Sequence, residues 1–207
     1  MVSSVFFNSY IIKIVGILNL IYKGKNMTFE EFVPLAIRTE SKNGSLNEEA
    51  KERGLTDRIV HSFMGIATEV YEYDLATVKK DAVNALEELG DMLWYLAVLK
   101  DELDFIIPND GELFNDLGFV FDMTGLDLVK KSMFYNKSLD HNKLKLVCTQ
   151  LYKEVNGAIR LHGGNPEHVM DVIIVKLKAR YGEAFSDDRA ENRELGVERA
   201  ILEDGLK

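Results

Sequence analysis

Residues 92–99, with the sequence MLWYLAVL, would be apolar on every side of a helix, and they constrain the fold more than any other segment. A helix without a polar face has to be surrounded by other parts of the protein. Apolar residues also recur at helical spacing elsewhere, for example in residues 59–73, and no long stretch alternates as a strand does. Only three prolines occur among the 207 residues. The sequence therefore predicts an all-α fold built as a helical bundle.

Start and stop signals divide the chain into helices. Thr28 and Glu31 have the spacing of a capping box, and Asn165 followed by Pro166 is typical of a helix start. We expect helices over residues 28–41, 56–75, 78–103, 126–135, 141–161, 166–181 and 189–202.

The N-terminal region differs in composition from the rest of the chain. Residues 5–22 are strongly apolar, but Lys13 lies near their centre, which counts against a membrane anchor of about 20 apolar residues. Neither the charge order nor the cleavage site of a secretory signal is evident. We expect residues 1–26 to be an extension outside the functional domain, which would cover residues 27–207.

Charge and cysteine content exclude some classes of function. The net charge of −9 argues against a nucleic-acid-binding surface, which needs a basic patch. Nucleotides are not excluded, because bound metal ions reverse the local field. The single cysteine, Cys148, rules out an intramolecular disulfide and a cysteine-based zinc site. A chain with a single cysteine suits a reducing compartment, so a cytoplasmic location is expected.

Two pairs of carboxylates are the main candidates for chemistry. Glu69 and Glu72 form an E-x-x-E motif, and Glu88 and Asp91 form an E-x-x-D motif. Residues three apart on a helix are neighbours, so each pair offers two oxygen ligands to one hard cation. A solvated face explains any one pair equally well. Glu88 and Asp91 share a helical face with Tyr95, however, which favours a position covered by protein.

The metal is expected to be Mg²⁺ or Mn²⁺. Two carboxylates about 6 Å apart repel by roughly 3 kcal/mol at an effective dielectric constant near 20. No lysine or arginine lies three or four residues from Asp91, so a bound cation is the expected compensation. All the ligands are oxygens, which does not suit zinc or copper. The Glu-x-x-His motif of a di-iron bundle does not occur in the chain.

The order of these motifs resembles the MazG-like all-α nucleoside triphosphate pyrophosphohydrolases, in their single-domain or phage-type branch. Residues 65–72 and 87–95 resemble the glutamate-rich core of that family, residues 27–39 its opening helix, and residues 176–193 its closing signature. The similarity covers about residues 27–100 and 166–193. Thr68 stands where the family commonly has Gly, and Ile173 where it commonly has Asn, which removes a polar contact to the substrate.

The resemblance implies a function and a set of site residues. The reaction would be Mg²⁺-dependent hydrolysis of a nucleoside or deoxynucleoside triphosphate between the α and β phosphates, giving a monophosphate and pyrophosphate. The partner would be this small nucleotide. The four metal ligands would be Glu69, Glu72, Glu88 and Asp91.

Three further residues are expected to act on the substrate. Lys176 and Arg180, four residues apart on the closing helix, would contact the triphosphate, although a solvated basic face explains either residue alone. Glu69, or Glu87 next to the ligand Glu88, would take the proton from the attacking water. Trp94 and Tyr95 are expected in the bundle core rather than in contact with a base.

The segment at residues 104–164 is longer than the compact members of the family need. It is either an insertion or a degenerate repeat, because residues 129–131 repeat the VKK of residues 78–80. As a second half it would complete a four-helix unit within one chain. Bundles of this family usually pair, so a homodimer is expected unless this segment replaces the partner chain.

Two other functions compete with this interpretation. The first is a non-catalytic helical protein that binds a nucleotide or a protein partner. The second is a phosphoribosyl-ATP pyrophosphohydrolase, which would have the same fold.

Overall fold

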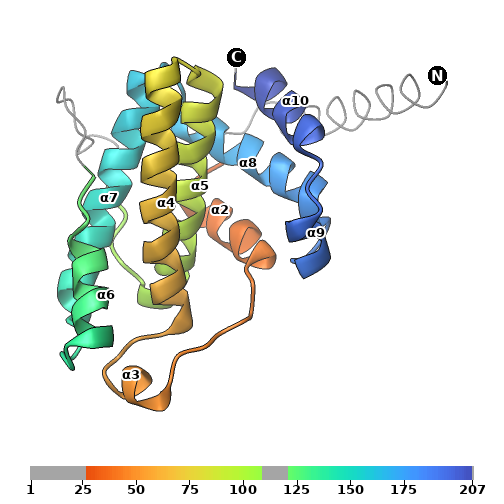
Figure 1. Ribbon diagram of the computed structural model, residues 1–207. Coiled ribbons are helices and arrows are strands. Elements are labelled where there is room, and N and C mark those ends of the chain that lie inside the picture. Colours follow the sequence, from red (N-terminus) through yellow and green to blue (C-terminus); the bar gives the residue numbers. More distant parts are fainter. Residues whose placement is uncertain (1–26, 109–120, 207) are drawn as a thin grey trace.

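The structure is a computed structural model that describes residues 27–108 and 121–206. Every regular element in these residues is a helix, so the all-α prediction is confirmed (Figure 1). The elements are α2 (Phe29–Ala36), the 3₁₀ helix η1 (Ile37–Thr39), α3 (Glu48–Glu52), α4 (Asp57–Lys79), α5 (Ala82–Leu103), α6 (Thr124–Phe134), α7 (His141–Leu161), α8 (Pro166–Tyr181), α9 (Asp187–Glu191) and α10 (Leu195–Gly205).

Four of these helices pack as a bundle. The long helices α4 and α5 form an antiparallel hairpin, α6 packs on α4, α7 packs on α5, and α6 contacts α7 (Figure 1). Helices α2 and α8 cover a further side of α5, and α10 lies on α8. Helix α5 is therefore the central helix of the molecule.

The apolar segment of α5 occupies the position that its composition predicts. Six of its eight residues have no exposed surface: Met92, Leu93, Leu96, Ala97, Val98 and Leu99. Trp94 and Tyr95 are the exceptions, because they are half-buried and pack against the core on one side only. Burial all round is thus confirmed for most of the segment and wrong for these two residues.

Helix boundaries depart from the expected ones at three places. The break between the two long helices lies at Lys80, whose φ of 59° is left-handed, and at Asp81, whose side chain accepts a hydrogen bond from the Asn84 backbone. The polar stretch at residues 46–54 contains the short helix α3, which Asn47 caps. The last predicted helix, 189–202, is divided into α9 and α10 by residues 192–194.

Gly90 sets the distance between α5 and α8. A Cβ atom at this position would lie 2.5 Å from Cγ1 of Ile173, which is too close, and 3.0 Å from Cγ1 of Val169, which is a tight contact. Ile173 is fully buried in this helix contact. The Ile173 side chain therefore fills the core at Gly90.

Several predictions about the chain's organisation remain predictions. Residues 1–26, for which an apolar extension without a membrane anchor was expected, lie outside the described residues. Among residues 27–108 and 121–206, no helix has both the length and the apolar character needed to cross a bilayer. The described part of residues 104–164 contributes α6 and α7, which complete a four-helix unit with α4 and α5. Its origin as a degenerate repeat stays a hypothesis.

Candidate functional site

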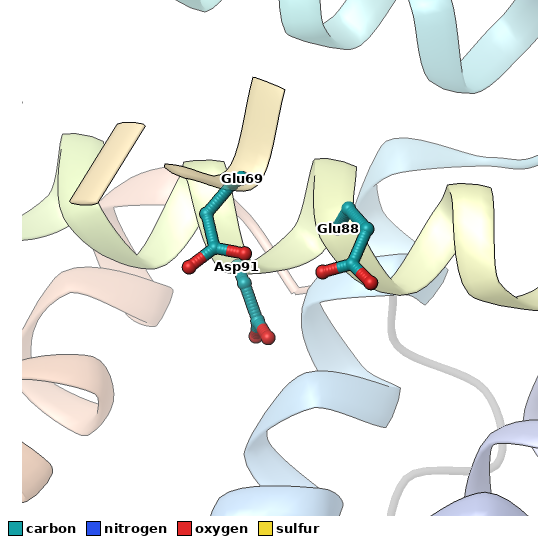
Figure 2. A group of neighbouring side chains, drawn as sticks. All are labelled: Glu69, Glu88 and Asp91. Atoms are coloured by element: carbon teal, nitrogen blue, oxygen red, sulfur yellow. The ribbon is translucent and has the colours of Figure 1, made fainter. Parts of the chain in front are cut away.

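Three of the predicted metal ligands come together between α4 and α5. Glu69 extends from α4, while Glu88 and Asp91 lie one turn apart on α5 (Figure 2). Each carboxylate offers one oxygen, and these oxygens all lie within 4.8 Å of one another. The helical spacing of Glu88 and Asp91 and the α4–α5 hairpin together create this cluster.

Burial and mutual repulsion act on two of these carboxyl groups. Burial, followed by the negative charges of Asp91 and Glu88, raises the pKa of Glu69 well above its usual value. Burial, followed by the charges of Asp91 and Glu87, also raises the pKa of Glu88. Both carboxyl groups are therefore harder to ionise than carboxyl groups in water, and a bound cation would favour their charged forms.

Glu72, the fourth predicted ligand, lies apart from the other three. Its side chain is exposed at the edge of the same pocket, and its oxygens are not among those within 4.8 Å of one another. Asn84, which was not predicted as a site residue, lies beside Glu88. The Asn84 amide donates a hydrogen bond of 2.8 Å to Oε1 of Glu88, one turn along α5. This contact orients the Glu88 carboxylate.

Lys176 has a different position from the one expected. Its side chain has no exposed surface, and its Nζ donates to Oδ1 and Oδ2 of Asp91 at 2.7 and 2.6 Å and to Oε1 of Glu87 at 3.2 Å. Burial lowers the pKa of the ammonium, but Asp91 and Glu87 outweigh burial and raise it. The protein thus supplies a cation for Asp91, and it does so from α8 rather than from the same helix.

A pocket of about 660 Å³ opens over the carboxylate cluster. Acidic residues form one part of its wall: Glu69, Glu72, Glu87, Glu88, Asp91 and Glu198. Arginines from the C-terminal third of the chain form another part: Arg180, Arg193 and Arg199. Aromatic side chains complete it: His61, Trp94, Tyr95, Tyr181 and Phe185. Negative, positive and aromatic groups therefore face one space, and Lys176 is buried behind Asp91 rather than exposed in that space.

The aromatic wall is held by specific contacts. The Trp94 indole donates 3.0 Å hydrogen bonds to the Ala36 carbonyl oxygen and to Thr39 Oγ1. The rings of Trp94 and Tyr95 meet edge to face, with centroids 4.9 Å apart. Gly65 on α4 makes room for Tyr95, because a Cβ atom there would lie 2.1 Å from that ring. Both aromatics pack against the core, as expected, and they also line the pocket.

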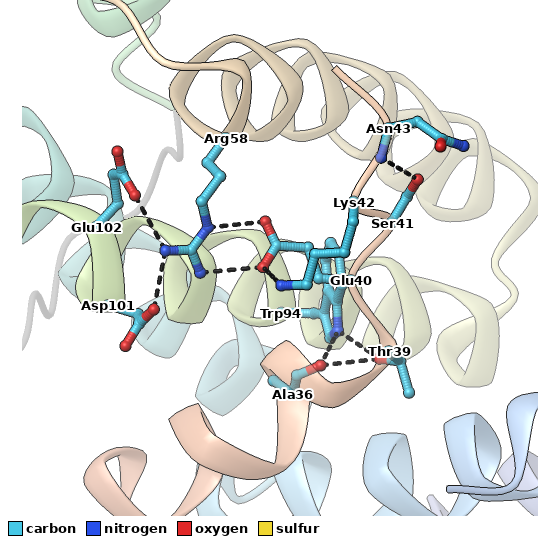
Figure 3. Close-up of polar contacts among 10 residues, drawn as sticks. All are labelled: Ala36, Thr39, Glu40, Ser41, Lys42, Asn43, Arg58, Trp94, Asp101 and Glu102. Carbon is cyan, nitrogen blue, oxygen red and sulfur yellow. Dashed lines mark hydrogen bonds and ion pairs between the residues drawn. The ribbon is translucent and has the colours of Figure 1, made fainter. Parts of the chain in front are cut away.

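A salt-bridge network fixes the segment that follows η1 (Figure 3). Glu40 is buried and accepts hydrogen bonds from Nε and Nη2 of Arg58 at 2.8 and 3.0 Å. The same guanidinium donates to Asp101 and Glu102, near the C-terminal end of α5. Thr39 and Ser41, on either side of Glu40, line the pocket. This network was not predicted, because its members are far apart in the sequence.

Arg180, the second predicted substrate contact, does line the pocket. Its guanidinium lies over the Tyr181 ring, 5.6 Å from the centroid, and donates through Nε to Oε1 of Glu198 at 2.9 Å. Arg193 also donates a hydrogen bond to the Glu198 carboxylate. The sequence did not predict that Arg180, Arg193 and Glu198 form a cluster. A weak signal exists for Arg193, which lies at the end of the closing signature.

The arrangement combines oxygen ligands for a hard cation, guanidinium groups for anions and aromatic surfaces for a planar ring. Comparison of the chain with protein-family models, with curated proteins and with solved structures found no match.

Proposed function

We propose that this protein is a MazG-like nucleoside triphosphate pyrophosphohydrolase, which hydrolyses a ribo- or deoxyribonucleoside triphosphate between the α and β phosphates. The observation that supports this proposal best is the composition of a single pocket. Three carboxylates with clustered oxygens, three arginines and five aromatic or imidazole rings line about 660 Å³. Pockets for small molecules are typically about 300–1,000 Å³, so a nucleotide fits this size.

The carboxylate cluster suits a hard divalent cation, Mg²⁺ or Mn²⁺. Glu69, Glu88 and Asp91 would hold it, because each offers an oxygen ligand and these oxygens lie within 4.8 Å of one another. When bound, the cation would neutralise phosphate oxygens and make a water molecule more acidic. Glu72, at the pocket edge, would join only after its side chain turns inward.

Two carboxylates are candidates for the proton acceptor. Glu69 belongs to the cluster itself, whereas Glu87 lines the pocket and accepts a hydrogen bond from Lys176. Either group could take a proton from a water molecule that attacks the α phosphate. Lys176 and Asn84 act as positioning residues, because they hold Asp91 and Glu88 respectively in fixed orientations.

The remaining walls would select and orient the nucleotide. The faces and edges of His61, Trp94 and Tyr95 offer stacking surface for a base, and stacking tolerates different bases. Arg180 and its neighbours offer planar N–H pairs, which match phosphate oxygens.

Pyrophosphate release from a panel of ribo- and deoxyribonucleoside triphosphates and phosphoribosyl-ATP, with Mg²⁺ present, tests this proposal. We expect the wild type to turn over at least one triphosphate, and we expect Glu88→Gln to lower the rate by about a hundredfold or more. Asp74→Asn is the matched control, because it removes an exposed carboxylate from α4, the helix that carries Glu69. Glu87→Gln tests Glu87 as the proton acceptor, because Glu87 is not one of the three carboxylates that would hold the cation.

Three results would count against parts of this proposal. Absence of turnover for every nucleotide, from folded protein with Mg²⁺ present, would favour the non-catalytic binding protein. Selective turnover of phosphoribosyl-ATP would assign the alternative substrate within the same fold. Equal rates for Glu88→Gln and Asp74→Asn would remove the carboxylate cluster from the mechanism.

A further inference from the structure

One buried carboxylate in the C-terminal part of the chain joins two of the pocket arginines. Glu198, on the first turn of α10, has only 4% of its surface exposed. Arg180 on α8 donates to it through Nε and Nη2, and Arg193, from the link between α9 and α10, donates through Nη2 at 2.7 Å. Both Nη2 atoms bind the same atom, Oε2 of Glu198, so the two guanidinium groups converge at one oxygen.

The charges in this cluster do not cancel. Two guanidinium groups and one carboxylate leave one positive charge in excess beside the pocket. Each guanidinium has five N–H donors, and the contacts to Glu198 use two from Arg180 and one from Arg193. In the described residues no other carboxylate lies within ion-pair distance of either arginine. Donors therefore remain for a second anion.

Glu198 stays ionised in this environment. Burial raises the pKa of its carboxyl, but hydrogen bonds from Arg180 and Arg193 outweigh burial and lower the pKa to about 2. A charged carboxylate accepts from both arginines at once and holds two mutually repelling guanidinium groups in place. An amide at this position would carry an NH₂ group that faces a donor.

Helix packing makes the arrangement rigid. Ile201 and Leu202, on the next turn of α10, are buried against the core, and Gly205 lies against Val172 of α8. The position of Glu198 is therefore set by the α8–α10 contact rather than by a mobile side chain.

We propose that Glu198 is a positioning residue that organises Arg180 and Arg193 into a two-arginine clamp for the pyrophosphate part of the substrate. This inference rests on the proposed function. Arg180 lies one helical turn after Lys176, whose ammonium binds Asp91, so the clamp borders the carboxylate cluster. Cleavage between the α and β phosphates places new negative charge on the pyrophosphate leaving group. Fixed guanidinium groups stabilise such charge without rearranging.

Binding of inorganic pyrophosphate with Mg²⁺, together with nucleotide kinetics, tests the clamp. We expect Glu198→Gln to weaken pyrophosphate binding and to raise KM for the triphosphate by about tenfold each, because charge-assisted contacts are lost. Binding of Mn²⁺ alone, at the carboxylate cluster, should not change. If the role of Glu198 were purely structural, Glu198→Gln would weaken the binding of pyrophosphate and of Mn²⁺ together. Glu198→Asp, which restores the charge, should recover part of the pyrophosphate affinity.

Two further variants keep the test interpretable. Arg193→Gln removes one arm from a partly exposed position and leaves Glu198 paired with Arg180, so it should fold even where Glu198→Gln does not. Glu203→Gln is the matched control, because it replaces a carboxylate on the same helix that pairs with Arg199. It should leave pyrophosphate binding unchanged.

The outcomes separate this inference from the proposed function. Turnover by the wild type with unchanged pyrophosphate affinity in both Glu198→Gln and Arg193→Gln would overturn the clamp and leave the enzyme standing. Loss of pyrophosphate affinity in these variants, with no turnover by the wild type, would keep the anion site and reject the hydrolase.

Discussion

Lys176 is a buried residue that holds one of the carboxylates of the proposed site in place. Its ammonium is fully buried and reaches both oxygens of Asp91 and one oxygen of Glu87. A lysine is buried in this way only where acidic groups replace its hydration. Asp91 keeps about a quarter of its side chain in contact with solvent, so the pair lies at the boundary between core and pocket.

Replacing Lys176 tests this role. We expect Lys176→Met to lower the free energy of unfolding by about 2 kcal/mol, less than the 3–5 kcal/mol typical of a fully buried pair, because water reaches Asp91. Urea denaturation measures the change. Adding Asp91→Asn should cost less than the sum of the two single effects, by at least about 1 kcal/mol, if the residues interact directly. Strict additivity would show that the pair contributes nothing to stability.

At the scale of secondary-structure elements, the contact between α5 and α8 decides where the site residues lie. Lys176 reaches Asp91 only because α8 approaches α5 closely, and Gly90 permits that approach by lacking a Cβ atom. Ile173 fills the space that Gly90 leaves. Gly90, which has no side chain, thus controls the geometry of a charged cluster.

Gly90→Ala should therefore destabilise the protein although alanine favours a helix. The new Cβ would overlap Ile173, and overpacking typically costs about 1–3 kcal/mol, more than the gain in helix propensity of about 1 kcal/mol. Combining it with Ile173→Ala should recover part of the loss relative to the sum of the single variants. Gly196→Ala in α10, where nothing lies within 4 Å of the new Cβ, is the control and should stabilise. Equal stability of the two alanine variants would contradict the close α5–α8 contact.

At the scale of the whole molecule, helices from both ends of the described chain share one hydrophobic core. The buried cluster runs from Phe29 in α2 to Leu202 in α10 and includes residues of α4, α5, α6, α7 and α8. Trp94 is the only tryptophan of the chain, and its hydrogen bonds join α5 to the end of α2 and to η1. Its fluorescence therefore reports the packing around the pocket.

We expect unfolding to be a single cooperative transition. Trp94 fluorescence and far-UV circular dichroism should give the same midpoint in urea, because the helices of residues 27–108 and 121–206 share one core. A fluorescence change at lower urea than the loss of helix would show that the pocket side opens before the α4–α7 bundle.

The sequence by itself determined the fold class and half of the site. Helical periodicity and the apolar segment of α5 predicted a bundle with that helix at its centre, since periodicity is a local property of the chain. The spacing of Glu88 and Asp91 predicted one carboxylate pair and the spacing of Glu69 and Glu72 predicted another, of which Glu69 joins the cluster. The break between the two long helices lies instead at Lys80 and Asp81, and residues 192–194 divide the last predicted helix.

Only the tertiary structure decided which charges meet. Lys176 and Asp91 are 85 residues apart, Arg58 and Asp101 43, and Arg180 and Glu198 18, and each pair joins different helices. Contacts of this kind depend on the angles and distances at which helices pack, and those follow from the fit of whole side-chain surfaces. Spacing within one helix carries no information about them.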